Sequence, residues 1–556
     1  MYRMSLTDFF KNIIDRFRQL FHLNSQKYQT KSHFSAYLIP LIVVAIIFMI
    51  NEYVLLTPIH LKSYAFIMLL IFLIAIFVIL HYILGGHFDK LSQLLLILGV
   101  VLFLYLVIGN IISLPVFHAK SYQQQLTLDK KADFYKDNET ISYQSIPVVD
   151  RDSAEKLGDR KMGQMVDYVS QFEVDESYSQ INYNDTPYRV TPLEYSDWIK
   201  WFTNRKEGLP AYIRVNMVTQ ESEVVELKEG MKYATSDHFG RNIYRHLRFN
   251  YPTKMFDELS FEINDKGVPY WVAPVYDYKI GFFGGKDIVG AVLVNAINGE
   301  HHYYDIKDVP QWVDRVYPSD LVIRQLENYG KYTNGFLNSM FSQKGVLQPT
   351  DGYNYIVIND DVYLYTGLTP VSKDASNVGF ALINLRTKDG KYYNISGAEE
   401  HSAMSSAEGK VQNLKYTATF PILVNASGEP TYFLSLKDGS NLVKMYAFVS
   451  VKNYQIVATG TTVSEAEKNY YEILAQNGKT NVVSQYEKIS GTVSDINSAV
   501  KEGNSIYYFK INGSDKIFIA NISLSNELPL LKAGDQVEIQ YIDGQSSVVC
   551  HEINVK

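Results

Sequence analysis

The chain has 556 residues, a net charge of −7 and an overall apolar content of 47%. This length predicts two to four domains, and so modest a charge gives no reason to expect nucleic acid as the main partner. The single cysteine, Cys550, excludes an intramolecular disulfide. Residues 36–117 are almost entirely apolar, whereas the remainder is polar and rich in tyrosine. We therefore expect a membrane region joined to a large soluble region built mainly from strands.

Residues 1–35 combine apolar and basic side chains at helical spacing. The apolar positions are Leu6, Phe9, Phe10, Ile13, Ile14, Phe17, Leu20 and Phe21, with Lys11, Arg16 and Arg18 between them. We expect a basic amphipathic helix in the cytoplasmic headgroup layer, acting as a passive anchor or as a docking site for a cytoplasmic partner.

Three apolar runs follow, and each has the roughly 20 residues that a helix needs to cross a bilayer. They lie at about 36–56, 64–84 and 92–117. Few polar residues interrupt them, namely Asn51, Glu52 and Asn110, which is a thin supply for the pathway of a channel or pump. We predict three transmembrane helices in contact with membrane lipid.

The distribution of basic residues predicts how these helices are oriented. The first 35 residues contain six Lys and Arg, whereas the two short hairpins offer one each, Lys62 and Lys90. Positive charge favours the cytoplasmic side, so we expect a cytoplasmic N-terminus in the plasma membrane. Three crossings then place residues 118–556 outside the cytoplasm.

After the helices, a polar stretch at 118–145 is expected to form a stalk, and residues 146–480 contain one recurring unit. Each copy has an aromatic strand, a variable loop, an apolar strand and a turn before a closing strand. The aromatic strands are Pro187–Val190, Pro269–Val272, Val362–Tyr365 and Pro430–Leu434. The apolar strands are Ala211–Asn216, Gly290–Asn295, Gly379–Asn384 and Met445–Val451. Helical patterns separate the copies at about 236–247, 318–330, 398–412 and 463–475, which predicts α+β modules with antiparallel sheets.

The order of aromatic strand, apolar strand ending in Asn, Gly-bearing turn and closing strand resembles PepSY-type modules. The whole chain after the apolar runs is similar to large uncharacterised envelope proteins of Gram-positive bacteria, some labelled as colicin V production or cell-shape proteins. The three apolar runs do not match the membrane domain of colicin V production proteins. The PepSY resemblance implies extracytoplasmic binding, or restraint of proteases and other envelope enzymes.

Residues 485–556 read as a separate unit of five short strands. These are Ser490–Val493, Ser505–Ile511, Lys516–Asn521, Gln536–Tyr541 and Ser547–Ile553. The turn Lys532–Val537 resembles one found in OB folds, so we expect an OB-like β-barrel. Its strands lack the basic and aromatic run that oligonucleotide binding needs.

No linear motif in the chain demands a catalytic chemistry. Gly-x-Ser-x-Gly, Walker and dinucleotide-binding motifs are absent, and Cys550 and His551 would point to opposite faces of a strand. Asp314 and Asp320 could be posed as an acid/base couple, but most acids are solvated surface. Phe282–Lys286 fits a hairpin tip. We therefore expect no catalytic residue and no cofactor.

Two clusters contain potential metal ligands, and neither has the spacing of a zinc site. In Glu300–His302, with Asp305, the adjacent histidines would alternate across a strand. Glu399–His401 lacks the two-histidine helical spacing, and Asn359–Asp361 lacks the remaining ligands of a calcium loop. We expect no metal.

The most concentrated aromatic feature is Asp197–Phe202, which contains Trp198, Trp201 and Phe202. One interpretation is a contact surface for a partner, a glycan or the outer leaflet. The other is a short helix that packs both indoles on the neighbouring strands. These three residues are the candidate partner-binding residues.

Together these patterns predict a membrane-anchored, non-catalytic binding or scaffold protein of the cell envelope. Its partner would be another envelope protein or a wall polymer. The alternative is an envelope enzyme acting on cell-wall material, or a regulator of envelope proteases or hydrolases. A deep polar cleft with convergent carboxylates or a Ser/His pair would favour an enzyme.

Overall fold

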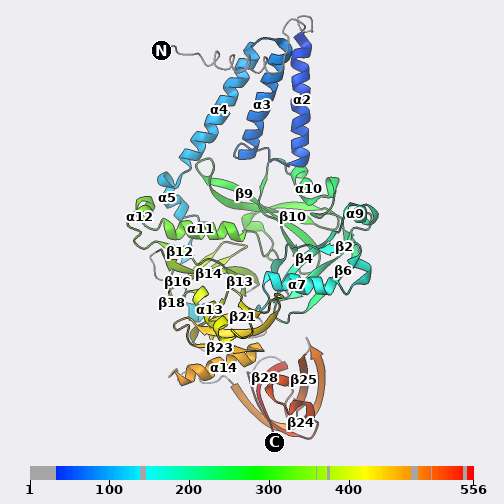
Figure 1. Cartoon of the computed structure of the whole chain (residues 1–556), viewed down its shortest axis with the longest axis vertical. Coiled ribbons are helices and arrows are strands. Elements are labelled where there is room, and N and C mark those ends of the chain that lie inside the picture. Colours follow the sequence, from blue (N-terminus) through cyan, green and yellow to red (C-terminus); the bar gives the residue numbers. More distant parts are fainter. Residues whose placement is uncertain are drawn as a thin grey trace.

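The computed structural model describes residues 33–137, 146–358, 360–371, 376–426, 428–477, 486–501, 504–542 and 547–556. The molecule is elongated, with three helices at one end, stacked sheets in the middle and the C-terminal strands at the other end (Figure 1). The amphipathic helix expected at 1–35 falls almost entirely outside the described residues.

Three long helices form the N-terminal region, as predicted. They are α2 (His33–Val54), α3 (Tyr64–Gly85) and α4 (Lys90–Ile112), and each is long and apolar enough to cross a membrane. Polar contacts tie them together at the end remote from the sheets: His81 Nδ1 lies 2.9 Å from the carbonyl of Ala36, and the Tyr37 hydroxyl donates to Asp89. The third helix ends before the predicted residue 117, because Pro115 starts a new helix, α5 (Pro115–Gln123).

The described part of the expected stalk, 118–137, packs against the sheets instead of leading away from them. Strand β1 (Leu128–Asp129) pairs in parallel with β17 (Gly390–Tyr393), and α6 (Phe134–Asp137) follows it. Leu126, Leu128 and Phe134 are buried. The stalk prediction is therefore wrong here, because these apolar side chains are spaced within a polar sequence and each fills a hydrophobic core.

Four sheets follow, and we call the units that contain them modules one to four. Module one has α7 (Arg151–Met162), α8 (Val166–Val169), β2 (Phe172–Val174), β3 (Ser179–Tyr183), β4 (Thr186–Tyr195), α9 (Trp198–Asn204), β5 (Leu209–Asn216) and β6 (Ser222–Met231). Module two has η3 (Phe239–Arg241), α10 (Ile243–Asn250), β7 (Met255–Phe256), β8 (Ser260–Ile263), β9 (Pro269–Ile280), β10 (Gly284–Asn295), β11 (His301–Asp305) and η4 (Ile306–Asp308).

Modules three and four repeat this order of elements. Module three has α11 (Ser319–Lys331), α12 (Gly335–Met340), β12 (Leu347–Pro349), β13 (Asn354–Ile358), β14 (Asp361–Pro370), β15 (Ser376–Asn377), β16 (Gly379–Asn384), β17 and β18 (Gly397–Ala398). Module four has α13 (Glu400–Lys410), β19 (Thr417–Ala418), β20 (Ile422–Ala426), β21 (Glu429–Lys437), β22 (Val443–Ser450) and β23 (Val457–Gly460), and α14 (Val463–Gln476) follows it.

The four sheets share one topology. Module one has the strand order β2-β4-β5-β6 with β3 also paired to β4, and modules two, three and four have β7-β9-β10-β11, β12-β14-β16-β17 and β19-β21-β22-β23 in the same arrangement. In each module the predicted aromatic strand begins the long central strand, and the predicted apolar strand lies within its neighbour, except that β22 ends one residue before the predicted Val451. The recurring unit that the sequence predicts is therefore present in four copies.

The repeated Asn explains why β5, β10 and β16 end alike. The Oδ1 atoms of Asn216, Asn295 and Asn384 each accept from the N–H groups two and three residues further on. Such Asx turns reverse the chain, and backbone hydrogen bonds between each Asn and the residues four and five positions further on close the turn. In all four modules, the N–H of the residue directly after this strand end donates to the backbone carbonyl of a residue at the start of the central strand. These pairs are Met217–Pro187, Ala296–Pro269, Leu385–Val362 and Val451–Pro430.

Shared hydrophobic cores join the modules to one another. One core contains Val190 of module one, Trp271 of module two and Phe433 of module four. A second core joins modules two and three, and a third joins modules three and four. Because each module shares a core with at least two others, the four close into a ring instead of forming a string of independent domains.

The last five strands form a separate unit at the far end of the molecule (Figure 1). They are β24 (Tyr486–Lys501), β25 (Asn504–Ile511), β26 (Ile517–Asn521), β27 (Gln536–Ile542) and β28 (Ser547–Val555). Each strand pairs with two others, in the order β24-β25-β26-β28-β27 and back to β24, so the sheet closes on itself. Two 3-10 turns, η5 (Ile522–Leu524) and η6 (Leu528–Leu530), connect β26 to β27. The unit has a core of its own, which includes Phe509, Phe518 and Cys550.

Candidate ligand-binding cavity

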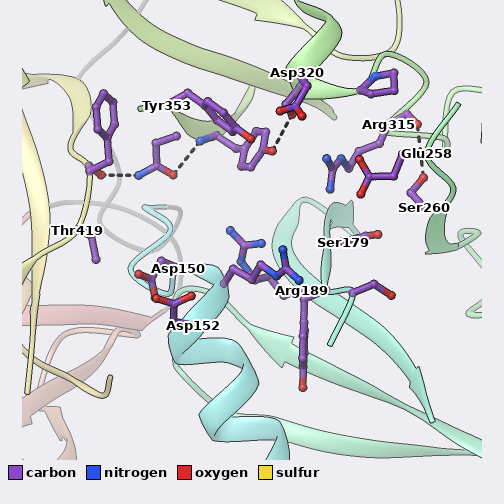
Figure 2. A pocket seen from close by; sticks show the side chains of 18 of the residues that line it. Asp150, Asp152, Ser179, Arg189, Glu258, Ser260, Arg315, Asp320, Tyr353 and Thr419 are labelled. Carbon is purple, nitrogen blue, oxygen red and sulfur yellow. Dashed lines mark hydrogen bonds between the residues drawn. The ribbon is translucent and has the colours of Figure 1, made fainter. Parts of the chain in front are cut away.

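A cavity of about 480 Å³ lies where the four modules meet. Its wall comes from segments far apart in the sequence, and Figure 2 shows their side chains converging on one space. The lining residues are Asp150, Arg151, Asp152, Ser177, Tyr178, Ser179, Arg189, Glu258, Leu259, Ser260, Arg315, Pro318, Ser319, Asp320, Tyr353, Asn354, Tyr355, Thr419 and Phe420. The volume is that of a small-molecule site.

The repeated topology explains why these segments converge. Ser179, Ser260 and Asn354 are the first residues of β3, β8 and β13, which are the equivalent strands of modules one to three. Thr419 and Phe420 directly precede the equivalent strand of module four, β20. The ring of modules therefore presents the same corner of each unit to a common centre.

Arg189 is the most deeply buried charge in this wall. It lies in β4, its side chain faces the cavity, and only 5% of the residue is exposed. Its one hydrogen bond to another described side chain is a long one, 3.4 Å from Nη2 to Gln180 Oε1, and its Nε has no partner. Burial lowers the pKa of Arg189 to about 10, because the charged form is partly removed from water. No described carboxylate forms an ion pair with it.

Arg315 supplies a second guanidinium from module three. Its backbone N–H donates to buried Glu262, and its guanidinium lies 5.5 Å from the centre of the Tyr355 ring. Its Nε is buried without a partner. Burial opposes the charge, but Tyr355 and Glu262 outweigh this effect and raise the pKa of Arg315. Like Arg189, it forms no ion pair with a carboxylate among the described residues.

Acidic side chains also line the cavity, and they fall into two groups. Asp150 and Asp152 are already engaged by Lys437, whose Nζ lies 2.5 Å from Asp150 and 3.4 Å from Asp152. Burial acts to raise the pKa of Asp150, but the bonds from Lys437 and Ser153 lower it overall. Glu258 and Asp320 are more exposed and form no ion pair with another described residue.

The hydroxyl groups of the wall are mostly held by other protein groups. Ser319 and Tyr355 share a hydrogen bond of 2.7 Å, and Ser179 accepts from the N–H of Phe261. Ser260 donates to Glu262 at 2.8 Å. Tyr178 is the exception, because its hydroxyl is buried with no partner among the described residues. That hydroxyl lies against Gly158 of α7, so what the wall offers a ligand is two guanidinium groups with no ion pair to a described carboxylate.

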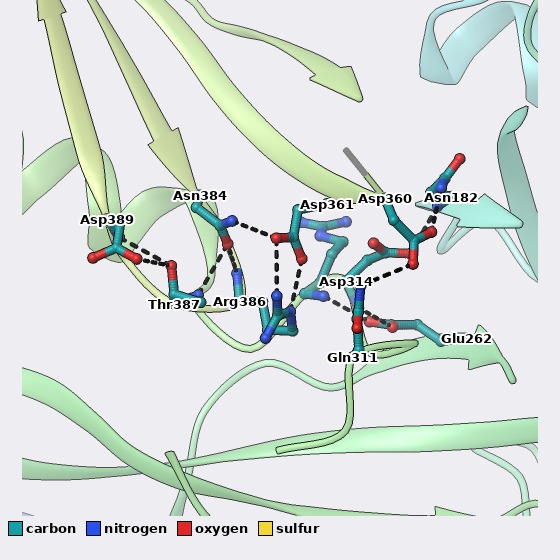
Figure 3. Close-up of polar contacts among 11 residues, drawn as sticks. Asn182, Glu262, Gln311, Asp314, Asp360, Asp361, Asn384, Arg386, Thr387 and Asp389 are labelled. Atoms are coloured by element: carbon teal, nitrogen blue, oxygen red, sulfur yellow. Dashed lines mark hydrogen bonds and ion pairs between the residues drawn. The ribbon is translucent and has the colours of Figure 1, made fainter. Parts of the chain in front are cut away.

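A buried polar network next to the cavity holds modules one to three in register (Figure 3). Glu262 accepts from the N–H groups of Asp314 and Arg315, and Asp314 accepts from the N–H of Asn182 at 2.7 Å. The Asn182 amide donates to Asp360 at 2.6 Å. Burial raises the pKa of both Glu262 and Asp314, and the proximity of the two carboxyls adds to this effect for Asp314. These contacts fix the position of the backbone at Arg315.

Further along the same network, Asp361 forms an ion pair with Arg386 at 2.7 Å. Asn384 donates to the same carboxylate at 2.9 Å. Across the described ranges, no group of three or more Asp, Glu, His or Cys side chains is arranged to hold a metal ion.

The predicted partner-binding residues lie on α9, outside the cavity. Trp201 is buried and donates its Nε1–H to Asp237 at 2.7 Å, as the packing interpretation requires. Trp198 and Phe202 are about half exposed, and the Arg205 guanidinium lies 3.8 Å from the centre of the Phe202 ring. The three residues therefore divide between a core role and a surface role.

The two histidine clusters have local structural partners. His301 Nδ1 lies 2.9 Å from the Tyr251 hydroxyl, whereas His302 packs its ring on Tyr304. Glu400 is fully buried and accepts from Asn377 and Tyr365.

The structure also locates the other residues that the sequence analysis considered as catalytic, metal-binding or loop residues. Asn359 lies outside the described residues. Asp314 is part of the buried network, whereas Asp320 lines the cavity, so the structure does not show them as one acid/base couple. Phe282 and Phe283 are at a hairpin tip, where their N–H groups donate to Ser113 Oγ at the end of α4.

Sequence reasoning missed the cavity, although one signal was available. The shared bond to the start of the central strand aligns Arg189 with Trp271, Leu364 and Tyr432 of the other modules. Those three side chains are buried, and each is aromatic or aliphatic. An arginine at a core position of a repeated unit indicates a site that only one copy carries.

Comparison with known proteins gives no assignment. No protein-family profile matches the chain, and no curated protein matches it either.

Proposed function

We propose that the chain is a membrane-anchored, non-catalytic binding protein of the cell envelope that receives an acidic ligand in the cavity between its four modules. Three helices suited to crossing a membrane support the anchor. The cavity, lined by residues of all four modules, supports ligand binding by the ring as a whole.

The observation that carries this proposal is the unpaired charge of Arg189. A buried guanidinium without a carboxylate destabilises a fold, so proteins rarely keep one unless a partner supplies the missing charge. Arg315 presents a second guanidinium to the same space. A carboxylate or phosphate is the group that guanidinium donors bind best.

Binding is favoured over catalysis by the state of the nucleophile candidates. Among the described lining residues there is no His or Cys. Three lining serines already have hydrogen-bond partners: Ser179 accepts from a backbone N–H, Ser260 donates to Glu262, and Ser319 shares a hydrogen bond with Tyr355. The alternative of an envelope enzyme would rely on Glu258 and Asp320, the two lining carboxylates that form no ion pair with a described residue. A regulator of envelope hydrolases fits the same architecture, with the ligand controlling the arrangement of the modules.

The modules are PepSY-like units and the closed C-terminal sheet is an OB-like barrel, consistent with their strand orders. The N-terminus is cytoplasmic and residues 118–556 are extracytoplasmic in a Gram-positive plasma membrane, as the basic residues before the first span indicate. The ligand would belong to an envelope protein or a wall polymer.

The proposal is tested by measuring thermal unfolding of the full chain in detergent while inorganic phosphate, sulfate, acetate or a peptide with a free α-carboxylate is added at constant ionic strength. A ligand that binds only the folded state raises the melting temperature in a saturable way. We expect such a rise for at least one of these anions, and its loss in Arg189→Met and in Arg315→Met.

Arg151→Met is the matched control, because this arginine lines the same cavity but is exposed and donates to the carbonyl of Glu176. It should retain most of the response. An equal response of wild type and Arg189→Met to every anion would contradict the proposal, as would no response at all.

A further inference from the structure

The surface around α9 is aromatic, exposed and close to the membrane helices, and ligand binding in the cavity does not account for it. Trp198, Ile199 and Phe202 on α9 and Phe239 on η3 are each more than half exposed. We call these four residues the α9 surface. The Trp198 and Phe239 rings lie 6.3 Å apart, which makes them neighbours in one patch.

The local backbone structure holds these side chains at the surface. Asp197 caps α9 by accepting from the N–H groups of Ile199 and Lys200, and buried Trp201 fixes the helix on Asp237. Phe239 has a φ of 52°, a left-handed conformation that is unfavourable for a non-glycine residue. A strained backbone that holds an aromatic ring in solvent points to a contact that the isolated chain does not make.

The same flank of the molecule contacts the end of the first membrane helix. Arg245 of α10 donates to the carbonyl of Tyr53 at 3.0 Å, and its guanidinium lies 4.6 Å from the centre of the Tyr53 ring. Phe249, also exposed, packs against the Tyr53 ring. In Figure 1, α10 lies directly against the lower end of α2, and α9 lies on the same side just beyond it.

Basic side chains border the patch. Lys200, Arg205 and Lys206 belong to α9 or follow it, and Arg241 donates to the carbonyl of Arg205. None of these four forms an ion pair with a described carboxylate. Aromatic rings flanked by cations that no described carboxylate neutralises, beside a membrane helix, are the combination that binds an interface with anionic headgroups.

We propose that the α9 surface docks on anionic lipid headgroups of the bilayer that the three helices cross. Trp198, Phe202 and Phe239 would enter the headgroup layer, while Lys200 and Lys206 would pair with lipid phosphates. Docking would fix the tilt of the module ring relative to the membrane. A partner protein on this surface would leave it exposed to water in a bilayer that contains only lipid, so the two occupants are distinguishable.

The chain itself provides the probe, because Trp198 is the one exposed tryptophan of its four, and all four are described. The full chain is placed in nanodiscs of phosphatidylcholine with phosphatidylglycerol, made with or without lipids brominated near the carbonyl end of one acyl chain. We expect the brominated lipids to quench part of the tryptophan emission. This quenching should disappear in Trp198→Phe and weaken when phosphatidylglycerol is omitted or when Lys200 and Lys206 are changed to Gln.

A second readout protects the test against misfolding of a variant. Acrylamide should quench Trp198 in wild-type protein at least about two-fold less in the anionic nanodiscs than in detergent, since a docked indole is shielded from water. Equal acrylamide quenching in both settings, together with no effect of bromine, would overturn the proposal and leave the surface to a soluble partner.

Discussion

Replacing Arg189 by Met should stabilise the ligand-free protein. Met is a long, flexible side chain of roughly similar shape to the stem of Arg. The substitution removes a buried charge that no described carboxylate neutralises. Most substitutions of buried residues destabilise, so a gain in stability is a demanding expectation.

The magnitude follows from the pKa of Arg189, which burial lowers to about 10. A solvated guanidinium has a pKa of about 12.5, so the drop corresponds to about 3 kcal/mol of unfolding free energy. The sign is that of a base with a lowered pKa in the folded state: the charge opposes folding at every pH below about 10. After the loss of the long bond to Gln180, a net gain of about 1–3 kcal/mol remains.

Differential scanning calorimetry of the full chain in detergent measures this effect, and the module transition should rise by about 2–6 °C. Arg189→Lys, which keeps the charge, should show no comparable gain. Arg151→Met should change the transition by less than about 1 °C, because that arginine is exposed. A fall of several degrees in Arg189→Met with Arg189→Lys unchanged would refute the reasoning, since it would show that the guanidinium holds the fold together.

Three further predictions concern the rest of the molecule. Burial raises the pKa of Asp314, so the folded state retains a proton that the unfolded state loses and stability falls as pH rises above about 4; Asp314→Asn should therefore melt higher than wild type by a margin that grows from acidic to mildly alkaline pH. Asn384→Ala removes a buried side chain that closes a turn and donates to a carboxylate, and chemical denaturation should show a loss of about 2 kcal/mol. In a Cys550→Ser background, a membrane-impermeant maleimide should label Leu530→Cys on intact cells but label His87→Cys only after lysis, whereas the reverse pattern would contradict the proposed orientation.

The strands and helices were largely predictable because their signals are local. The pairs of aromatic and apolar strands, with Asn at the end of three of them, recur in the sequence and form the same hydrogen bonds in the structure. The helix predicted at 318–330 appears as α11, and that predicted at 463–475 appears as α14. The pattern at 236–247 yields a shorter helix that starts at Ile243, because Asn242 caps it there.

The ring of modules and its cavity could not be read from the sequence, because no local pattern says which faces meet. Leu128 belongs to a polar stretch that reads as a stalk, yet it fills a core because β17 offers a free edge to pair with. Ser179 and Ser260 are far apart in the chain and meet only because equivalent strands point to one centre. Trp201 and Trp198 were indistinguishable in sequence, and the buried Asp237 decides which indole is core.

The most direct test of the central claim is hydrogen–deuterium exchange of the full chain with and without the anion that gives the largest thermal shift. If the ligand occupies the cavity, exchange should slow together in five separate segments that represent all four modules, around Asp150, Ser179, Ser260, Tyr355 and Thr419, and this protection should vanish in Arg189→Met. Protection confined to one module, or located away from these segments, would show that the anion binds elsewhere and that the four-module cavity is not the binding site.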